Sequence, residues 1–189
     1  MIKDIFMNVT EAMKSSGVVA AVKDENGFRR ALGSRASVVF LLKSELLTVG
    51  ETVERAHAAG KKILVHVDLT EGIGKDEAAI RYIAERVKPD GVITTRPNIV
   101  KCAKACGLYT VFRVFLIDTQ GLDSALSNAD KLRPDAVELM PGLIPSLVGR
   151  FLAPSRAVIA GGLITTREQA AAAIKAGAVA ASTSAPELW

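Results

Sequence analysis

The sequence has few of the features on which extracellular or membrane proteins depend. It contains two cysteines among 189 residues. Cys102 and Cys106 lie four positions apart, without CxxC spacing or histidine partners, so we interpret them as inert core thiols and expect no metal and no cofactor. The longest uncharged stretches, 139–149 and 176–186, are eleven residues long. A membrane-spanning helix needs about 18 or more, so we expect none and no membrane partner.

Other sequence signals are also missing. The N-terminal stretch mixes acidic and basic residues and has no uninterrupted apolar segment before a cleavage site, so we expect no signal peptide and a cytoplasmic protein. Walker A, GxGxxG and GxSxG patterns are absent, which leaves nucleotide binding, dinucleotide binding and serine hydrolysis without support. Aromatic residues form 5% of the chain, too few for the stacking platform typical of a single-strand nucleic-acid reader.

The composition that remains is that of a folded chain. Hydrophobic residues form 49% of the sequence, enough to build a core, and the length suits a single domain over 1–189. Twenty-four basic residues against 20 acidic ones give a net charge of +4. The segment 86–104 has five basic residues and one acidic residue. Such a segment either contacts phosphates or is a solvated face, and composition alone does not indicate RNA binding.

Short apolar runs alternate with helical periodicity along the whole chain. This alternation predicts βα units, and the continuous apolarity of the runs is typical of strands buried on both faces. Eight runs within 189 residues predict a small α/β fold of the (β/α)8 TIM type with a truncated last helix. An open flavodoxin-like sheet is the alternative, but it needs about five strands. The predicted strands cover 17–22, 37–42, 62–69, 90–95, 109–116, 135–140, 156–160 and 178–182.

In such a barrel a phosphate group is usually bound by the loops after the seventh and eighth strands. After the seventh run, Gly161 and Gly162 allow close approach of an anion, and Thr165 is expected to begin the next helix. The eighth run leads into hydroxyl side chains and a capped turn that we expect to begin at Ser184. The predicted phosphate ligands are therefore Gly161, Gly162, Ser182, Thr183 and Ser184. The alternative is a tight turn followed by a helix cap.

Polar residues at other strand ends form a second candidate group. His66 and Asp68 are two positions apart, which places them on one face of the third predicted strand. Buried charges must be paired or bind a ligand, so we expect an ion network at the barrel mouth. The alternatives are acids and arginines that neutralise one another for structural reasons and a histidine that belongs to the core. The candidate residues are His66, Asp68, Arg96, Arg113 and Glu138.

The same residues leave an enzymatic reading open. His66, Asp68 and Glu138 could transfer protons on a phosphorylated polyol or sugar, as in an isomerase or aldolase. Schiff-base chemistry needs a lysine buried at a strand end. Lys23, Lys43 and Lys75 stand beside other charges in loops instead. The sequence therefore offers a phosphosugar-processing barrel as an alternative, with no assigned catalytic residue.

Five segments of the chain together form a recognisable pattern. They are HVDLTEGIGKDE, VITTRPNIVKCAK, RVFLIDT, PDAVELMPGLIPSL and IAGGLITTREQAAAAIKAGAVAASTSAPELW. In these segments the chain resembles the glycerol-3-phosphate-responsive antiterminator family of the glycerol uptake operon. The resemblance extends from about Gly17 to the last residue and keeps the order of the segments. It implies a (β/α)8-type regulator, not an enzyme, that senses glycerol 3-phosphate and acts on the leader mRNA of glycerol-utilisation genes. Lys101 and Lys104, on the polar side of a predicted helix, are our candidates for RNA contact.

Overall fold

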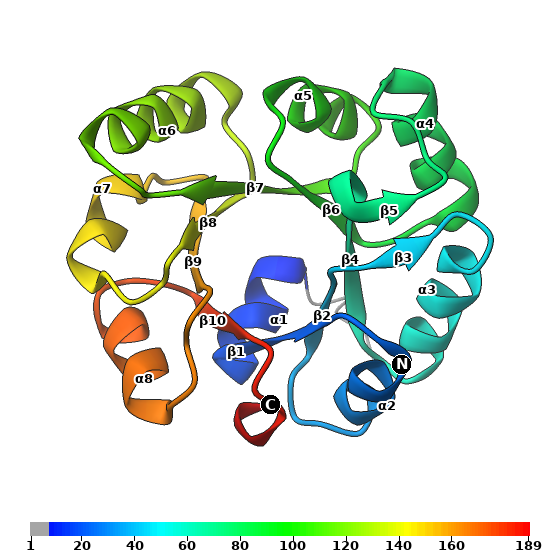
Figure 1. Cartoon of the computed structure of the whole chain (residues 1–189), viewed down its shortest axis with the longest axis horizontal. Coiled ribbons are helices and arrows are strands. Elements are labelled where there is room, and N and C mark those ends of the chain that lie inside the picture. The colour runs from blue at the N-terminus through cyan, green and yellow to red at the C-terminus, as the bar shows by residue number, and fades with distance from the viewer. Residues whose placement is uncertain (1–7) are drawn as a thin grey trace, which may run out of the picture.

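The computed structural model describes residues 8–189, so the first part of the stretch tested for a signal peptide lies outside the described residues. Eight parallel strands close into a barrel in the order β1-β10-β9-β8-β7-β6-β4-β2 (Figure 1). The predicted barrel is therefore confirmed, and the open sheet is excluded. The strands are β1 (Val18–Val22), β2 (Val38–Leu41), β4 (Lys62–His66), β6 (Gly91–Thr94), β7 (Tyr109–Phe115), β8 (Ala136–Met140), β9 (Ala157–Gly161) and β10 (Ala180–Thr183).

The third predicted strand is shorter than expected. It ends at His66, and the chain continues as the 3-10 turn η1 (Val67–Leu69). A two-residue strand, β5 (Thr70–Glu71), then pairs in parallel with β3 (Ser44–Glu45) outside the barrel sheet. The prediction that Asp68 shares a strand face with His66 is thus wrong, because the strand alternation that it assumes stops two residues earlier.

Seven helical segments connect the barrel strands, as predicted, and form the outer ring in Figure 1. After β10 the chain forms one 3-10 turn, η4 (Pro186–Leu188), which confirms the truncated last helix. The connecting segments are α2 (Glu25–Leu32), α3 (Val49–Ala58), α4 (Glu77–Tyr82) continuing into the π-helix η2 (Ile83–Val87), α5 (Pro97–Ala105), α6 (Thr119–Leu132), η3 (Pro145–Leu147) with α7 (Val148–Phe151), and α8 (Arg167–Lys175).

Short polar side chains begin several of these helices. The carboxylates of Asp24, Asp76 and Asp118 each accept a hydrogen bond from the backbone N–H three residues later, at the starts of α2, α4 and α6. Each carboxylate thereby satisfies a helix N–H group that has no partner within the helix. Gly107 has a φ of 75° just after α5, a conformation that favours glycine at the end of a helix.

An additional helix, α1 (Val9–Ser16), precedes the first strand and was not predicted. Asn8 caps its start, and Gly17 ends it at a φ of 67°. Figure 1 shows α1 across the centre of the ring, behind the strands. Its buried residues Val9, Ala12 and Met13 pack against inward-facing strand residues such as Phe40 and Leu64. The N-terminal end of the barrel is therefore filled by α1, which leaves the C-terminal strand ends for a ligand.

No helix among residues 8–189 is long and apolar enough to cross a membrane.

The outward-facing sides of the strands pack against the surrounding helices in two large apolar clusters. One contains Phe28, Val53 and Ile80, and the other contains Phe112, Leu139 and Phe151. The barrel core is therefore built on both sides of the sheet, as the continuous apolarity of the strands predicts.

Candidate ligand-binding site

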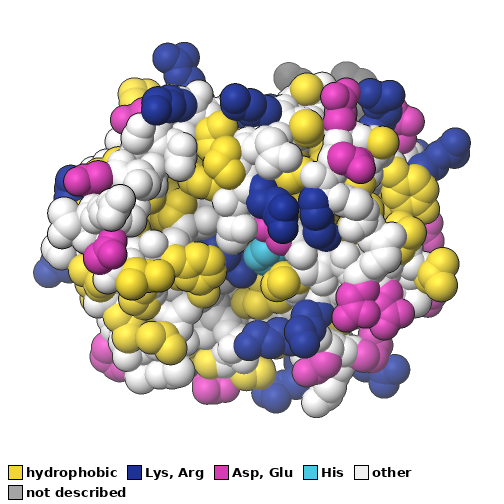
Figure 2. All heavy atoms as spheres, turned by 45° about the horizontal axis from the view of Figure 1, so that its top comes forward, with side chains coloured by type: hydrophobic (Ala, Val, Ile, Leu, Met, Phe, Trp, Pro, Cys, Tyr) yellow, Lys and Arg dark blue, Asp and Glu magenta, His cyan; other side chains and the backbone are white. Residues whose placement is uncertain are grey.

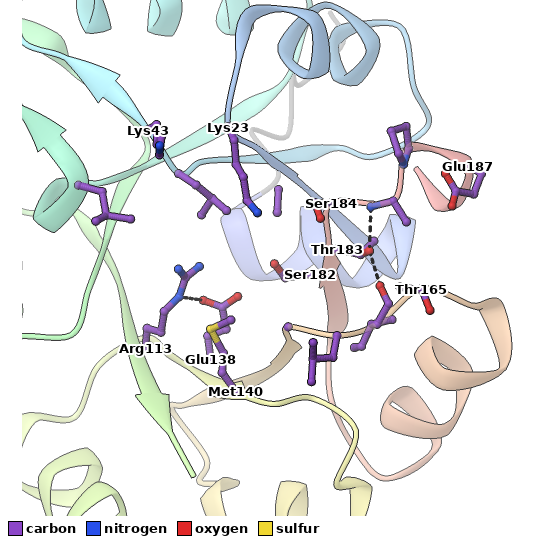
Figure 3. A pocket seen from close by; sticks show the side chains of 18 residues that line it. Lys23, Lys43, Arg113, Glu138, Met140, Thr165, Ser182, Thr183, Ser184 and Glu187 are labelled. Atoms are coloured by element: carbon purple, nitrogen blue, oxygen red, sulfur yellow. Dashed lines mark hydrogen bonds and ion pairs between the residues drawn. The ribbon is translucent and has the colours of Figure 1, made fainter. Parts of the chain in front are cut away.

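A cavity of about 730 Å³ opens at the C-terminal ends of the barrel strands. Ligand sites of barrels with this architecture lie at this face. The lining residues come from the ends of β1, β2, β7 and β8 and from the loops after β9 and β10 (Figure 3). They include Lys23, Lys43, Arg113, Glu138, Met140, Gly162, Leu163, Thr165, Ser182, Thr183, Ser184 and Glu187. The structure thus brings four of the five predicted phosphate ligands into one cavity.

The loop after β9 has an unusual backbone. Gly162 has a φ of 73°, and Leu163 follows it with a φ of 60°. A non-glycine residue in this left-handed region costs on the order of 1–3 kcal/mol and is concentrated at functional sites. Because both residues line the cavity, the strained segment forms part of its wall.

Gly161 does not line the cavity. A Cβ atom at this position would lie 2.4 Å from Oε1 of Glu138, so the missing side chain of Gly161 leaves space for that carboxylate. The role predicted from the sequence was close approach to an anion from the ligand. The structure instead places a carboxylate of the protein against Gly161.

Thr183 links the two predicted phosphate loops. Its hydroxyl donates to the carbonyl oxygen of Ile164 at 2.6 Å and accepts the N–H of Ala185 at 3.0 Å. Its own carbonyl oxygen accepts the indole N–H of Trp189 at 2.9 Å. Thr183 therefore positions the loops, while Ser182 and Ser184 present the other hydroxyls of β10 and its loop to the cavity.

The helix starts in these loops differ from the predicted ones. Thr166 caps α8, and its side chain pairs reciprocally with Gln169, so the capping box begins one residue later than expected at Thr165. Thr165 is left to line the cavity. In the last turn the capping position is Ala185 rather than Ser184, and its methyl group supplies no capping hydrogen bond.

Arg113 and Glu138 form a buried ion pair inside the barrel. They are register partners on β7 and β8, and Arg113 Nε donates to Glu138 Oε2 at 2.6 Å. Oε1 of Glu138 is buried and has no hydrogen-bond partner among the described residues. Both side chains line the cavity, and Figure 3 shows the outer guanidinium nitrogens of Arg113 directed into it. The guanidinium of Arg113 is thus placed to donate to a polar ligand, and Oε1 of Glu138 is a buried acceptor without a partner of its own.

Asp68 and Arg96 form a separate group that does not line this cavity. Asp68 accepts hydrogen bonds from the Thr94 hydroxyl and from the N–H and hydroxyl of Thr95, all at 2.7–2.9 Å. Arg96 Nε lies 3.5 Å from Asp68 Oδ1. Among the described residues, the residues of the predicted ion network therefore form two separate ion pairs, Arg113 with Glu138 and Arg96 with Asp68. Asp68 mainly connects η1 to the end of β6.

His66 is buried at the end of β4 and does not line the cavity. Its Nδ1 has no hydrogen-bond partner in the described part of the chain. Burial, followed by the nearby charge of Arg113, lowers the pKa of His66 from 6.5 to about 4. The imidazole is therefore neutral at neutral pH.

The cavity also contains two lysines that we did not propose as ligands. Lys23 directly follows β1, and Lys43 lies two residues after β2. Figure 3 shows the Lys23 side chain reaching toward the cavity between Ser184 and Arg113. Their position just beyond strand ends was the signal, but adjacent charges made both resemble ordinary loop residues. Lys75 differs, because its amine donates to the carbonyl oxygens of Val67 and Thr70.

Both predicted RNA contacts lie on the outside of the barrel. Lys101 and Lys104 are exposed on α5, whose Ile99, Val100 and Ala103 face the core. The Lys104 amine donates to the carbonyl oxygen of Arg133 at the end of α6. Figure 2 shows basic side chains both around the hollowed C-terminal face and over the flank of the molecule, where hydrophobic side chains are also exposed.

The two thiols and the other potential metal ligands form no cluster in the described part of the molecule. Cys102, on α5, and Cys106, directly after it, are free thiols and half-buried. Within residues 8–189, no group of three or more histidine, cysteine or acidic side chains could hold a metal ion.

Comparison with known proteins identifies a family with which this chain shares most of its length. A sequence model described as "glycerol-3-phosphate responsive antiterminator" matches residues 18–189. An uncharacterized protein of Escherichia coli K12, YgcP, is 32% identical over 184 residues, which cover 97% of this chain and 96% of that protein.

Two solved structures are similar in both sequence and fold. A glycerol uptake operon antiterminator regulatory protein from Listeria monocytogenes is 34% identical with a TM-score of 0.86, covering 92% of this chain and 94% of the other. A glycerol uptake operon antiterminator-related protein from Thermotoga maritima is 33% identical with a TM-score of 0.82, covering 92% and 97%. Three aldolase structures are 12–18% identical and share the fold alone.

Proposed function

Because the chain belongs to the glycerol-3-phosphate responsive antiterminator family, we propose that it binds glycerol 3-phosphate in the cavity and, in response, acts on the leader mRNA of glycerol-utilisation genes. The observation that carries this proposal is the composition of one cavity. Two loops suited to phosphate and an ion pair suited to hydroxyl groups line the same space.

The loops after β9 and β10 would bind the phosphate. Ser182 and Ser184 offer hydroxyl donors, and Gly162 lines the same space in a positive-φ conformation that favours glycine. α8 begins at Arg167, so the positive end of its dipole lies close in sequence to Thr165 on the cavity wall. Gly161 and Thr183 would act indirectly, by making space for Glu138 and by holding the two loops together.

Arg113 and Glu138 would bind the glycerol hydroxyls. The unpartnered Oε1 of Glu138 can accept a hydrogen bond, and the outer nitrogens of Arg113 can donate. A ligand hydroxyl would thereby satisfy a carboxylate oxygen that is otherwise buried without a partner. His66, Asp68 and Arg96 would support this wall from outside the cavity.

A regulatory role fits these groups better than proton transfer does. Catalytic acids and bases work best with a pKa near the working pH. His66 has a pKa of about 4 and lies outside the cavity lining. The Glu138 carboxylate is already paired with Arg113. Isomerase or aldolase chemistry therefore has no observation in its favour beyond the shared barrel.

RNA contact would be made by the outside of the barrel, where Lys101 and Lys104 are exposed. A route from ligand to surface runs through the end of the chain. Ser184 and Glu187 line the cavity, while Trp189 packs in the apolar cluster that contains Phe28 of α2. Movement of the loop after β10 would therefore change the packing against the outer helix α2.

Two measurements on the wild-type protein test this proposal. Glycerol 3-phosphate at about a hundred times its Kd should stabilise the fold by about 2.7 kcal/mol, whereas glycerol and inorganic phosphate at the same concentration should stabilise it less. Binding of leader RNA, followed by fluorescence anisotropy, should change when glycerol 3-phosphate is added. A melting temperature that glycerol 3-phosphate does not change would overturn the effector assignment. An RNA affinity that is the same with and without glycerol 3-phosphate would overturn the regulatory role.

A further inference from the structure

Lys23 and Lys43 are cationic residues of the cavity wall with no assigned role. In the part of the chain that the structure describes, neither amine has a hydrogen bond or an ion pair. The other lysine near the mouth, Lys75, is held by two backbone carbonyl groups. Lys23 and Lys43 thus bring two positive charges to the cavity that the protein does not neutralise by direct contact.

The other charged residues that line the cavity leave one net negative charge, that of Glu187. Arg113 is paired with Glu138, and Glu187 is an exposed carboxylate at the rim. Lys23 and Lys43 also line a neighbouring groove together with four acidic residues; these are Asp24, Glu25, Glu45 and Glu71. None of them lies within ion-pair distance of Lys23 or Lys43, and Glu25 is already held by Arg29 and Arg55.

The strand order fixes where these lysines act. β1 lies between β10 and β2 in the barrel, so Lys23 follows the strand next to the predicted phosphate loop. Figure 3 shows the Lys23 amine on the same side of the cavity as Ser182 and Ser184, and Arg113 on the other side. A phosphate at the β9 and β10 loops would therefore lie nearer to Lys23 than to Lys43.

We propose that Lys23 and Lys43 are the counter-ions of the ligand and select a dianionic phosphate monoester over an ester of the same shape with a single negative charge. This inference rests on the proposed function, since it concerns the same cavity. Two unneutralised lysines match the two charges that a phosphate monoester approaches at neutral pH. The uncharged glycerol end would lie at the Arg113–Glu138 pair, which is already electrically balanced.

The test compares glycerol 3-phosphate with glycerol 3-sulfate by isothermal titration calorimetry. The two esters have nearly the same shape, but the sulfate ester carries one negative charge. We expect the wild-type protein to bind the phosphate ester at least about tenfold more tightly, the size expected for one hydrogen bond between charged groups. K23Q should weaken phosphate binding by about tenfold and sulfate binding less, and K23Q/K43Q should bind both esters about equally.

K14Q is the matched control, because Lys14 is an exposed lysine on α1 at the opposite end of the barrel. It should preserve the preference, and the melting temperatures of all variants should stay close to that of the wild type. Equal wild-type affinity for the two esters, or an unchanged preference in K23Q/K43Q, would overturn the counter-ion role while leaving glycerol 3-phosphate as the effector. If the wild type binds neither ester, both the proposed effector and this inference fail.

Discussion

Arg113 and Glu138 face each other on neighbouring strands, and 2.6 Å separates Arg113 Nε from Glu138 Oε2 inside the barrel. Their side chains are 7% and 1% exposed. A carboxylate so deeply buried is stable as an anion only when it is paired. The same pair therefore serves the stability of the barrel and the polarity of the cavity.

Removing one member of this ion pair should destabilise the fold more than removing both members. E138L leaves the Arg113 guanidinium buried without its partner and should lower the free energy of unfolding by about 3–5 kcal/mol. The double variant R113M/E138L removes both charges and should recover most of that loss. Urea denaturation measures both values. Equal stability of E138L and the wild type would show that water satisfies Arg113.

Asp68→Asn should affect stability rather than ligand binding. The carboxylate accepts three hydrogen bonds from Thr94 and Thr95 and does not line the cavity. An amide retains one acceptor oxygen, so we expect a loss of about 1–3 kcal/mol in the free energy of unfolding and unchanged affinity for glycerol 3-phosphate. A stable variant with weakened ligand binding would place Asp68 in the ligand site.

The pKa of His66 predicts a pH dependence of stability. Burial lowers this pKa from 6.5 to about 4, so between these values the unfolded chain binds more protons at His66 than the folded protein does. The resulting stabilisation is complete above pH 6.5 and is lost as the pH falls toward 4, by up to about 3 kcal/mol. Urea denaturation of H66Q should show a shallower slope in this range than the wild type.

The outer face of α5 can be tested independently of the cavity. Replacing Lys101 and Lys104 together with glutamate should weaken leader RNA binding and leave glycerol 3-phosphate binding intact. The slope of log K against log salt should fall by about 0.7 for each phosphate of a single strand that the variant no longer neutralises. Unchanged affinity and salt slope would mean that this helix is a solvated face. K14E, a charge reversal on α1 at the opposite end of the barrel, is the matched control.

Trp189 offers a direct optical measurement of the coupling between the cavity and the surface. It is the single tryptophan of the sequence, and its indole N–H donates to the carbonyl oxygen of Thr183 at the cavity wall. Glycerol 3-phosphate should therefore change the intensity or the emission maximum of tryptophan fluorescence, with the same Kd as in calorimetry. T183V, which removes the hydroxyl link to Ile164, should reduce this change. An unchanged spectrum at saturating ligand would separate Trp189 from the cavity.

The periodicity of the sequence predicted which side chains of a strand face the inside of the barrel. Alternation along β7 and β8 places Arg113 and Glu138 on inward faces, and the position of β10 brings Ser182 to the lumen. Features that depend on distant parts of the chain were missed. The missing side chain of Gly161 is needed because Glu138, 23 positions earlier, packs against it. Asp68 moved from the strand face because the chain turns at Val67, which no apolar pattern indicated.

The helix α1 has a consequence for the kinetics of ligand exchange. Because its apolar residues fill the N-terminal end of the barrel, a ligand must enter and leave through the same C-terminal opening. A macromolecule that covers this opening, and binds the empty and occupied forms equally well, would slow association and dissociation by the same factor. The equilibrium constant would not change, since equal affinity for two states shifts neither. With such a partner bound, the protein would respond more slowly to a change in ligand concentration, while its affinity for the ligand would stay the same.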